Sequence, residues 1–297
     1  MNKSDRHIAI IGAASGWGAQ IRTTEDAPQF LDNKGFSGRF SNVNSMQVVH
    51  PKIPSSQGEN ISPADALPHV VDVASLVFKE VSDFVSNKKF PLVIGGDHSI
   101  AVGTWSALVQ SLNAAGEFGL IWFDAHMDAH TPDTSPSNAY HGMPVAALLG
   151  EGEARLTGMG APNTKLRPEH VVLIGIRDYE PGESERLERL GVRVIKMDEI
   201  AERGVEECFD EAIKIASSAP KGFGISVDMD GFDPESAPGV GSPVPGGLLP
   251  KDVLPCFKKI GSAPTLRGVE ITEFNPHLDK DDKTSALVID VAAAFLE

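Results

Sequence analysis

The stretch GLIWFDAHMDAH, at residues 119–130, joins an unbroken apolar run to a dense group of possible metal ligands. The run from Gly119 to Phe123 is typical of a strand that is covered on both faces of a parallel sheet. Asp124, His126 and Asp128 follow it two residues apart, so on an extended chain they point to the same side. This stretch predicts a buried strand that ends in a convergent set of ligands.

Two other apolar runs end in a similar way. The run from Phe90 leads into GGDHS, which contains His98, and the run from Gly224 leads into SVDMDGFDP, which contains Asp228 and Asp230. Ligands in open α/β sheets gather at the carboxyl ends of the strands. We therefore expect these polar residues to meet the first group in space.

The three strand ends together offer four carboxylates and two imidazoles. Any one of them taken alone could equally cap a loop or find a backbone partner. Jointly, however, buried carboxylates repel one another at high cost unless a cation pairs them. Six ligands exceed a tetrahedral zinc site and fit two divalent ions, with manganese as the first choice for an oxygen-rich set. Such a pair can share a water and lower its pKa toward neutrality, which makes a hydroxide nucleophile.

The rest of the chain alternates short apolar runs with segments of helical spacing, which predicts an α/β fold. We expect a three-layer α-β-α arrangement with a central, mostly parallel sheet. The expected strands are His7–Gly12, Phe90–Gly95, Gly119–Phe123, Val171–Ile176, Val192–Ile195, Gly224–Asp228 and Leu266–Ile271. The expected helices are Ala64–Asn87, Ile100–Leu112, Val205–Ala216 and Thr284–Leu296. Thr131–Ser137 and Pro234–Gly247 are expected to be ordered loops.

The composition limits the function classes. With 297 residues, of which 41% are hydrophobic, the chain can bury one large core, so we expect a single domain over residues 1–297. A net charge of −15 argues against a nucleic-acid surface. The apolar run near the N-terminus is too short for a signal peptide or a membrane span. Cys208 and Cys256 read as buried thiols of a reducing compartment, so a cytoplasmic location is expected.

The motifs GGDHS, DAHMD and SVDMDGFDP, in this order, resemble the three signatures of the arginase/agmatinase (ureohydrolase) family. The likeness extends over nearly the whole chain, because IAIIGA near the start, IGIRDYEPGE at 174–183 and GVEITEFNP at 268–276 also match arginase-like segments. Three linked motifs make this a specific signal. The resemblance implies an arginase-like fold that assembles into trimers or hexamers.

The resemblance also implies a ligand set for two Mn²⁺ ions, with Ni²⁺, Co²⁺ and Fe²⁺ left open. One ion would be held by His98, Asp124, Asp128 and Asp228. The other would be held by His126, Asp124, Asp228 and Asp230. Asp124 and Asp228 would then bridge the two ions.

Three residues acquire catalytic roles from the resemblance. Glu273 matches the carboxylate that pairs with a guanidinium, and a bidentate carboxylate can orient that planar cation. Asp128 would pass the proton of the nucleophile to the leaving amine. His141, in YHGMP, matches a histidine that carries protons to and from solvent.

The substrate head group is expected to contact residues of three further segments. The expected contacts are His130, Ser137, Asp178, Glu180, Glu183 and Ser242. His130 stands where arginases have Asn and has three interpretations: a donor to a substrate carboxylate, a ring packed beside Pro132, or an extra metal ligand. Asn138–Ala139 also departs from the Gly–Asn of arginases.

The implied reaction is hydrolysis of L-arginine to L-ornithine and urea. Within the same class, the alternatives are agmatine, guanidinobutyrate, hydroxyarginine, guanidine and formimidoylglutamate. A catalytically inactive scaffold with this fold is the alternative from another class.

Overall fold

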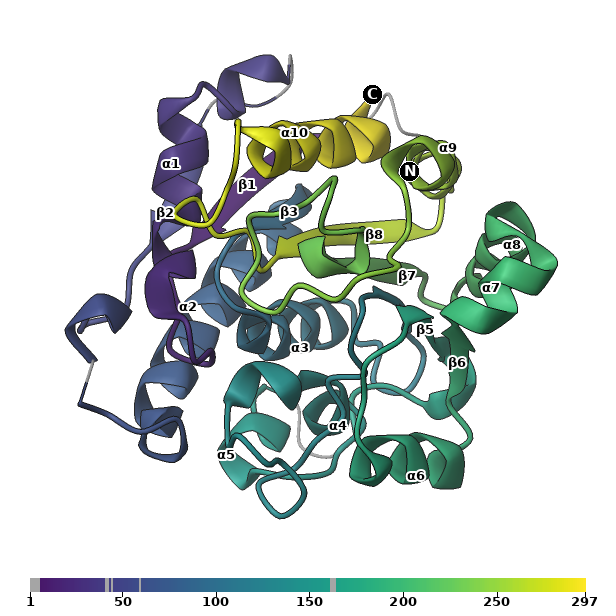
Figure 1. Cartoon of the computed structure of the whole chain (residues 1–297), viewed down its shortest axis with the longest axis horizontal. Helices are drawn as coiled ribbons and strands as arrows, with labels where there is room; N and C mark the ends of the chain where they lie inside the picture. Colours follow the sequence, from purple (N-terminus) through teal and green to yellow (C-terminus); the bar gives the residue numbers. More distant parts are fainter. Residues whose placement is uncertain (1–5, 41–42, 44, 59, 161–163) are drawn as a thin grey trace.

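The computed structural model describes residues 6–40, 43, 45–58, 60–160 and 164–297. An eight-stranded sheet runs through the middle of the molecule in the order β2-β1-β3-β8-β7-β4-β5-β6, and every neighbouring pair is parallel (Figure 1). The strands are β1 Ile8–Ala13, β2 Met46–Val49, β3 Phe90–Ile94, β4 Gly119–Phe123, β5 Val171–Ile176, β6 Arg193–Lys196, β7 Phe223–Asp228 and β8 Leu266–Thr272.

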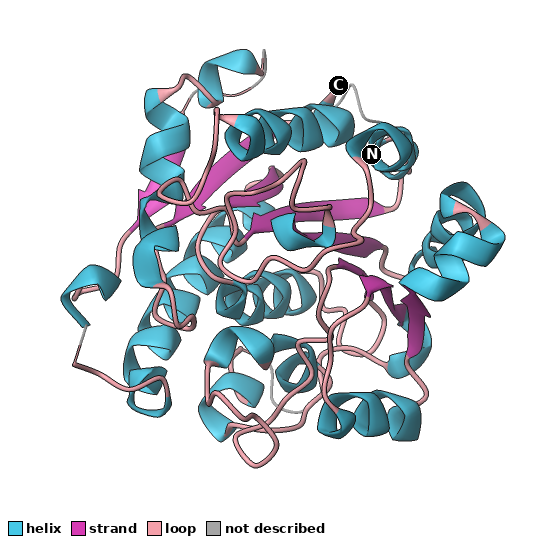
Figure 2. Cartoon of the chain, in the orientation of Figure 1, coloured by secondary structure: helices cyan, strands magenta, loops and turns pink. Residues whose placement is uncertain are grey.

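Helices cover both faces of this sheet, as Figure 2 shows. The α-helices are α1 Ala27–Asn33, α2 Leu67–Ser86, α3 Ala101–Ser111, α4 Pro144–Leu148, α5 Ala154–Thr157, α6 Pro181–Leu190, α7 Met197–Arg203, α8 Val205–Ser217, α9 Pro250–Gly261 and α10 Lys283–Leu296. The 3-10 helices are η2 Arg22–Asp26, η3 Ser37–Arg39, η4 Ser55–Gly58, η5 Ala64–Ala66, η6 His98–Ile100, η7 Tyr140–Gly142, η8 Pro168–His170 and η9 Met229–Gly231.

Strand side chains alternate between two hydrophobic cores. In β4, Ile121 and Phe123 join the core under α1, α8, α9 and α10, whereas Leu120 and Trp122 join the core under α2, α3 and α4. This alternation follows from the two-residue period of an extended chain, and both faces are apolar because both are covered. The three-layer α-β-α architecture expected from the sequence is confirmed.

The order of the strands positions the candidate ligands. The strands β3, β8, β7 and β4 are consecutive neighbours in the middle of the sheet. In the sequence they are far apart, because β3 begins at residue 90 and β8 ends at residue 272. Because all four are parallel, their carboxyl ends lie at the same edge. The residues that follow them are therefore brought together, as the sequence predicts.

All expected strands and helices are present, with ends that differ by at most three residues. All seven expected strands form, but the sequence reading missed the edge strand β2, which has only four residues. It also missed the helices α1, α4, α5, α6, α7 and α9. Charged residues dominate α6 (PGESERLERL), which leaves it few apolar side chains. In α9 the interior Pro255 argues against a helix, although Val253, Cys256, Phe257 and Ile260 have helical spacing. Thr131–Ser137 and Pro234–Gly247 are irregular loops, as expected.

Within the part of the chain that the structure describes, no helix combines the length and apolar character needed to cross a membrane.

Replacing Phe257 with Ala should lower the free energy of unfolding by about 3–5 kcal/mol, because the deletion leaves a cavity that cannot fully collapse. Phe257 is fully buried, and its ring contacts those of Phe123, Phe209, Phe232 and Phe295. Denaturant unfolding of the metal-free protein measures the change. The control Ile53→Ala removes an exposed side chain and should shift the value by about 0.5 kcal/mol or less. Equal losses in the two variants would contradict this account of the core.

Candidate active site

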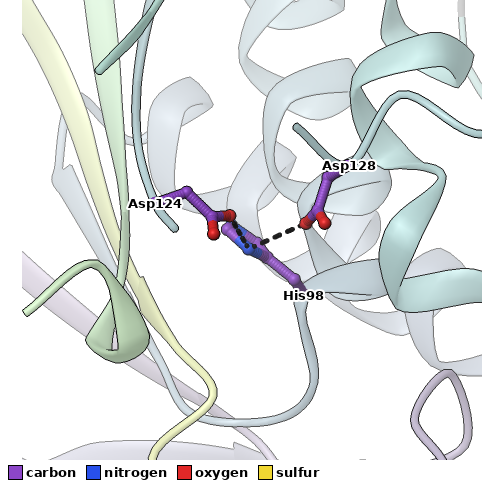
Figure 3. A group of neighbouring side chains, drawn as sticks. All are labelled: His98, Asp124 and Asp128. Carbon is purple, nitrogen blue, oxygen red and sulfur yellow. Dashed lines mark ion pairs between the residues drawn. The ribbon is translucent and has the colours of Figure 1, made fainter. Parts of the chain in front are cut away.

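His98 lies at the centre of the first group of carboxylates (Figure 3). Its Nδ1 atom is 3.0 Å from Asp228 Oδ2, 3.2 Å from Asp124 Oδ2 and 3.2 Å from Asp128 Oδ2. His98 opens η6 after β3, whereas the three carboxylates follow or end β4 and β7. The strand ends that the sequence singled out therefore converge on one point.

A second group lies beside the first and shares Asp124 with it. His126 Nδ1 is 3.2 Å from Asp230 Oδ2 and 3.4 Å from Asp124 Oδ1. Asp124 thus directs one oxygen toward His98 and the other toward His126, which is the geometry of a bridging carboxylate. Donor atoms of His98, Asp124 and Asp128 lie within 4.8 Å of one another, and so do those of Asp124, His126 and Asp230.

Hydrogen bonds behind His98 fix the orientation of its ring. The Ser226 hydroxyl donates to Glu270 Oε1 at 2.7 Å, so it accepts the proton of His98 Nε2 at 2.8 Å. Nδ1 therefore faces the carboxylates: it donates to them while it is protonated, and it would offer its lone pair to a cation that displaces the proton. Trp122 stacks on the ring at 4.0 Å between centroids, and its Nε1 donates to Asp124 Oδ2.

Ser226 and Glu270 were missed by the sequence reading. Both are fully buried in the middle of apolar strands, and they are adjacent across β7 and β8. A polar residue inside an apolar strand could have indicated this role, because a buried carboxylate needs hydrogen-bond partners. Thr104 and Trp105 of α3 also donate to Glu270.

The crowding of the carboxylates shifts their pKa values. Burial raises the pKa of Asp128 to about 6, with repulsion from Asp124 adding to it. Burial and repulsion from Asp230 and Asp124 raise the pKa of Asp228 well above its usual range. Burial alone would lower the pKa of His98, but its hydrogen bonds to Asp124, Asp128 and Asp228 reverse the shift. A divalent cation would relieve this repulsion, so the donor set fits metal binding.

His141 and Glu273 lie next to these ligands. His141 Nδ1 is 3.0 Å from Glu273 Oε1, and the same oxygen accepts the backbone N–H of His98 at 2.8 Å. Asp128 and Glu273 both have left-handed backbone conformations, with φ of 49° and 62°. Non-glycine residues seldom adopt this region, and such strain concentrates at functional sites.

A cavity of about 250 Å³ opens over the two groups. Its lining includes every candidate catalytic and head-group residue from the sequence: Asp128, His130, Ser137, His141, Asp178, Glu180, Glu183, Ser242 and Glu273. His126, Asp228 and Asp230 also line it, whereas His98 and Asp124 are fully buried beneath. Gln20 lines the cavity as well and was not anticipated, because no motif marks it.

The head-group candidates differ in how far they are engaged by the protein. Asp178 is mostly exposed, with Oδ2 3.8 Å from His126 Nε2. Ser137 accepts the backbone N–H of Ala139 at 3.2 Å. Glu183 is buried and accepts the backbone N–H groups of Ala129 and Glu180. Its carboxylate therefore already has two partners inside the protein.

His130 is buried beside Glu180 and Glu183. Its Nδ1 is 3.1 Å from Thr134 Oγ1, and its Nε2 is 2.9 Å from Glu180 Oε2 and 3.3 Å from Glu183 Oε2. The three residues could also hold a cation, since their donor atoms lie within 4.8 Å of one another. Packing against Pro132 does not account for these polar contacts.

Arg177 ties together the backbone around the second group. Its guanidinium donates to the carbonyls of Gly175, Asp230, Gly231, Phe232 and Val244 at 2.7 to 3.2 Å. The carboxyl end of β5, the turn that carries Asp230 and the loop that carries Ser242 are thus joined. Arg177 lies in the motif IGIRDYEPGE, but nothing in the spacing indicated this role.

The whole described chain from residue 6 to residue 297 matches the Arginase family. The chain belongs to the arginase family. An arginase from Brevibacillus brevis is 35% identical over 291 residues, which cover 96% of each chain. The crystal structure of an arginase from Bacillus subtilis superposes with a TM-score of 0.86 at 32% identity, covering 98% of each chain. An Entamoeba histolytica arginase in complex with L-ornithine superposes with a TM-score of 0.88 at 28% identity, again covering 98% of each chain.

Metal binding should strengthen as the pH rises. The raised pKa values of Asp128, Asp228 and His98 mean that these groups retain protons under mildly acidic conditions. A cation must displace those protons, so affinity should increase from about pH 6 to about pH 8. Calorimetric titration of the metal-free protein with Mn²⁺, in two buffers of different ionisation enthalpy, gives the affinity and the number of protons released.

The matched control is Glu188→Gln, which neutralises an exposed carboxylate of α6 and should leave the titration unchanged. If affinity is the same at both pH values and no protons are released, the proposed ligands are wrong.

Proposed function

We propose that this arginase-family hydrolase converts L-arginine and water to L-ornithine and urea with two Mn²⁺ ions per chain. The observation that carries the proposal is the convergence of four carboxylates and two imidazoles under a cavity that also contains Glu273. The L-ornithine bound to the Entamoeba histolytica arginase supports this substrate class.

The residues proposed to hold the ions are those named from the sequence. One ion would take His98, Asp124, Asp128 and Asp228, and the other His126, Asp124, Asp228 and Asp230. When bound, the ions would supply an activated water by lowering its pKa. Their identity as manganese rests on the oxygen-rich ligand set, and Ni²⁺, Co²⁺ or Fe²⁺ would find the same donors.

Glu273 is proposed to bind the guanidinium. Its carboxylate is buried, and one oxygen is fixed by the backbone N–H of His98 and by His141. The hydrogen bond to His141 outweighs the effect of burial, so the pKa of Glu273 is lowered and its charge is retained. A fixed anion beside the metal ligands can orient the planar cation so that its central carbon faces the water.

Asp128 and His141 are proposed to move protons. Asp128 lines the cavity next to His98, where it can pass a proton from the attacking water to the leaving amine. His141 is partly exposed and touches Glu273, so it can exchange protons between the cavity and solvent.

The outer part of the cavity is proposed to bind the amino-acid head. Asp178 and Glu180 make it acidic, which suits an ammonium group, while Ser137 and Ser242 offer hydroxyls to a carboxylate. Glu183 adds little charge at neutral pH, because burial raises its pKa to about 8. The described lining contains no lysine or arginine to pair with that carboxylate. This favours agmatine, which has the ammonium but no carboxylate, as the second candidate substrate.

We further propose that the chain works as a single domain in the cytoplasm and assembles into trimers or hexamers. The continuous sheet supports the single domain, and the buried, unpaired Cys208 and Cys256 suit a reducing compartment.

A urea-release assay across guanidino compounds tests the proposed function. The metal-free protein should be inactive and should regain activity with two equivalents of Mn²⁺, with L-arginine giving the highest kcat/KM. If agmatine exceeds arginine roughly tenfold or more, the substrate assignment fails while the hydrolase chemistry stands. Full activity with one ion or none would refute the two-metal site.

His141→Ala should lower kcat for arginine roughly a hundredfold and leave KM nearly unchanged. Burial lowers the pKa of His141, but the hydrogen bond to Glu273 prevails and the pKa is about 9. The neutral, proton-accepting form therefore increases as the pH rises from 7, and the wild-type kcat should rise with it. Rate measurements against pH, with and without added imidazole, check both points. An unchanged kcat in the variant would remove His141 from the mechanism.

A further inference from the structure

The hydrogen bonds of His130 leave its ring without a free donor. A carboxylate only accepts, so the contact of Nε2 with Glu180 Oε2 at 2.9 Å requires the proton on Nε2. Nδ1 then faces Thr134 Oγ1 at 3.1 Å and can accept the hydroxyl proton. Both ring nitrogens are therefore satisfied by the protein, which argues against direct donation to a substrate carboxylate.

The backbone around His130 is fixed too. Its N–H donates to the carbonyl of Gly142 at 2.9 Å, and Thr134 Oγ1 accepts the N–H of Thr131 at 3.0 Å. The neighbouring Ala129 is held through Glu183 and Arg186 of α6. The imidazole is thus a rigid, buried group between the loop after Asp128 and the start of α6.

Glu180 is held from two sides at the mouth of the cavity. Glu180 is the N-cap of α6, and in a capping box its side chain accepts the backbone N–H of Glu183 while the Glu183 side chain accepts the backbone N–H of Glu180. The Glu180 side chain is about half exposed, at 53%. Among the described contacts, His130 is the only residue outside α6 that holds its carboxylate. The hydrogen bond from His130 also lowers the pKa of Glu180, so this carboxylate is ionised at neutral pH.

We propose that His130 is a positioning residue that determines substrate specificity: it holds Glu180 over the cavity mouth, and Glu180 selects guanidino substrates that carry a distal ammonium group. The proposal rests on the proposed function, and it adds that His130 acts on the substrate indirectly, through Glu180. Without His130 only the capping box would restrain the Glu180 side chain, so more rotamer freedom would be lost on binding than when both contacts are present.

Four compounds separate the two charges of the head group. L-arginine carries ammonium and carboxylate, agmatine carries only the ammonium, 5-guanidinopentanoate carries only the carboxylate, and butylguanidine carries neither. The Mn²⁺-loaded wild type is compared with His130→Ala and Glu180→Gln. The control is His170→Ala, because His170 is partly exposed at the amino end of β5 and bonds to Ser218, at the opposite edge of the sheet from the site.

In His130→Ala, we expect KM to rise roughly tenfold for arginine and agmatine, since a charge-assisted contact is weakened. KM for the two compounds without an ammonium should stay constant, and kcat should be unchanged for all four. Glu180→Gln should give the same pattern with a larger rise. Metal content should equal that of the wild type in both variants.

Three results would overturn the proposal. A rise confined to arginine and 5-guanidinopentanoate would make His130 a direct carboxylate donor. A uniform rise, or a fall in kcat, would make it a support of the whole loop. Loss of a bound metal ion would make His130, Glu180 and Glu183 a cation site. If His130→Ala does not fold, an unchanged KM for arginine in Glu180→Gln overturns the proposal.

Failure of the proposed function gives a different result. A wild type that releases urea from none of the four compounds refutes that function. The affinities of the four compounds for the wild type and the variants, measured by calorimetry, still test the role of His130.

Discussion

Electrostatic repulsion among four buried aspartates is the constraint on which the rest of the structure depends. Asp124, Asp128, Asp228 and Asp230 are all nearly inaccessible to solvent, and a low-dielectric interior offers little screening. The fold holds them together because each follows or ends a central strand whose apolar residues are locked between two layers of helices. Burial of apolar side chains in the two cores therefore stabilises a site conformation that the isolated segments would not adopt.

Residues outside the proposed metal ligands fix the orientation of the side chains in the site. On one side, the hydrogen bonds from His98 through Ser226 to Glu270 fix which nitrogen faces the carboxylates. On the other side, Glu183, Arg186 and His130 attach the loop after Asp128 to α6. The inner part of the cavity is thus built from strand ends, whereas its mouth is built from a loop and a helix start. Chemistry and recognition are controlled by different elements of the fold.

The sequence was informative where a side chain's environment follows from its place on a strand. Asp124, His126 and Asp128 could be placed at the site because an apolar run of five residues reports burial, and its end reports the edge of the sheet. Strand alternation does not account for their common direction, because β4 ends at Phe123 and Asp128 has a left-handed backbone conformation. The sequence was uninformative for Met46–Val49, because four residues are too few to show a repeat of apolar side chains. It was also uninformative for α6, because this helix is mostly charged and has few apolar residues to mark its buried face. The contacts of His130 with Thr134 and Glu180 were also beyond reach, since they join two segments that no periodicity relates.

The guanidinium of Arg177 couples regions of the chain that would otherwise vary independently. Because one side chain binds the carbonyls of both Asp230 and Val244, an insertion or deletion between them that moved Val244 would also displace Asp230, a proposed metal ligand. Length changes in residues 234–247 are therefore disfavoured, even though this segment has no regular secondary structure. Among the described contacts, the segment from Thr131 to Ala139 has no such tether to Asp228 or Asp230. Divergence toward new substrates should therefore accumulate in that segment, while the opposite wall of the cavity keeps its length.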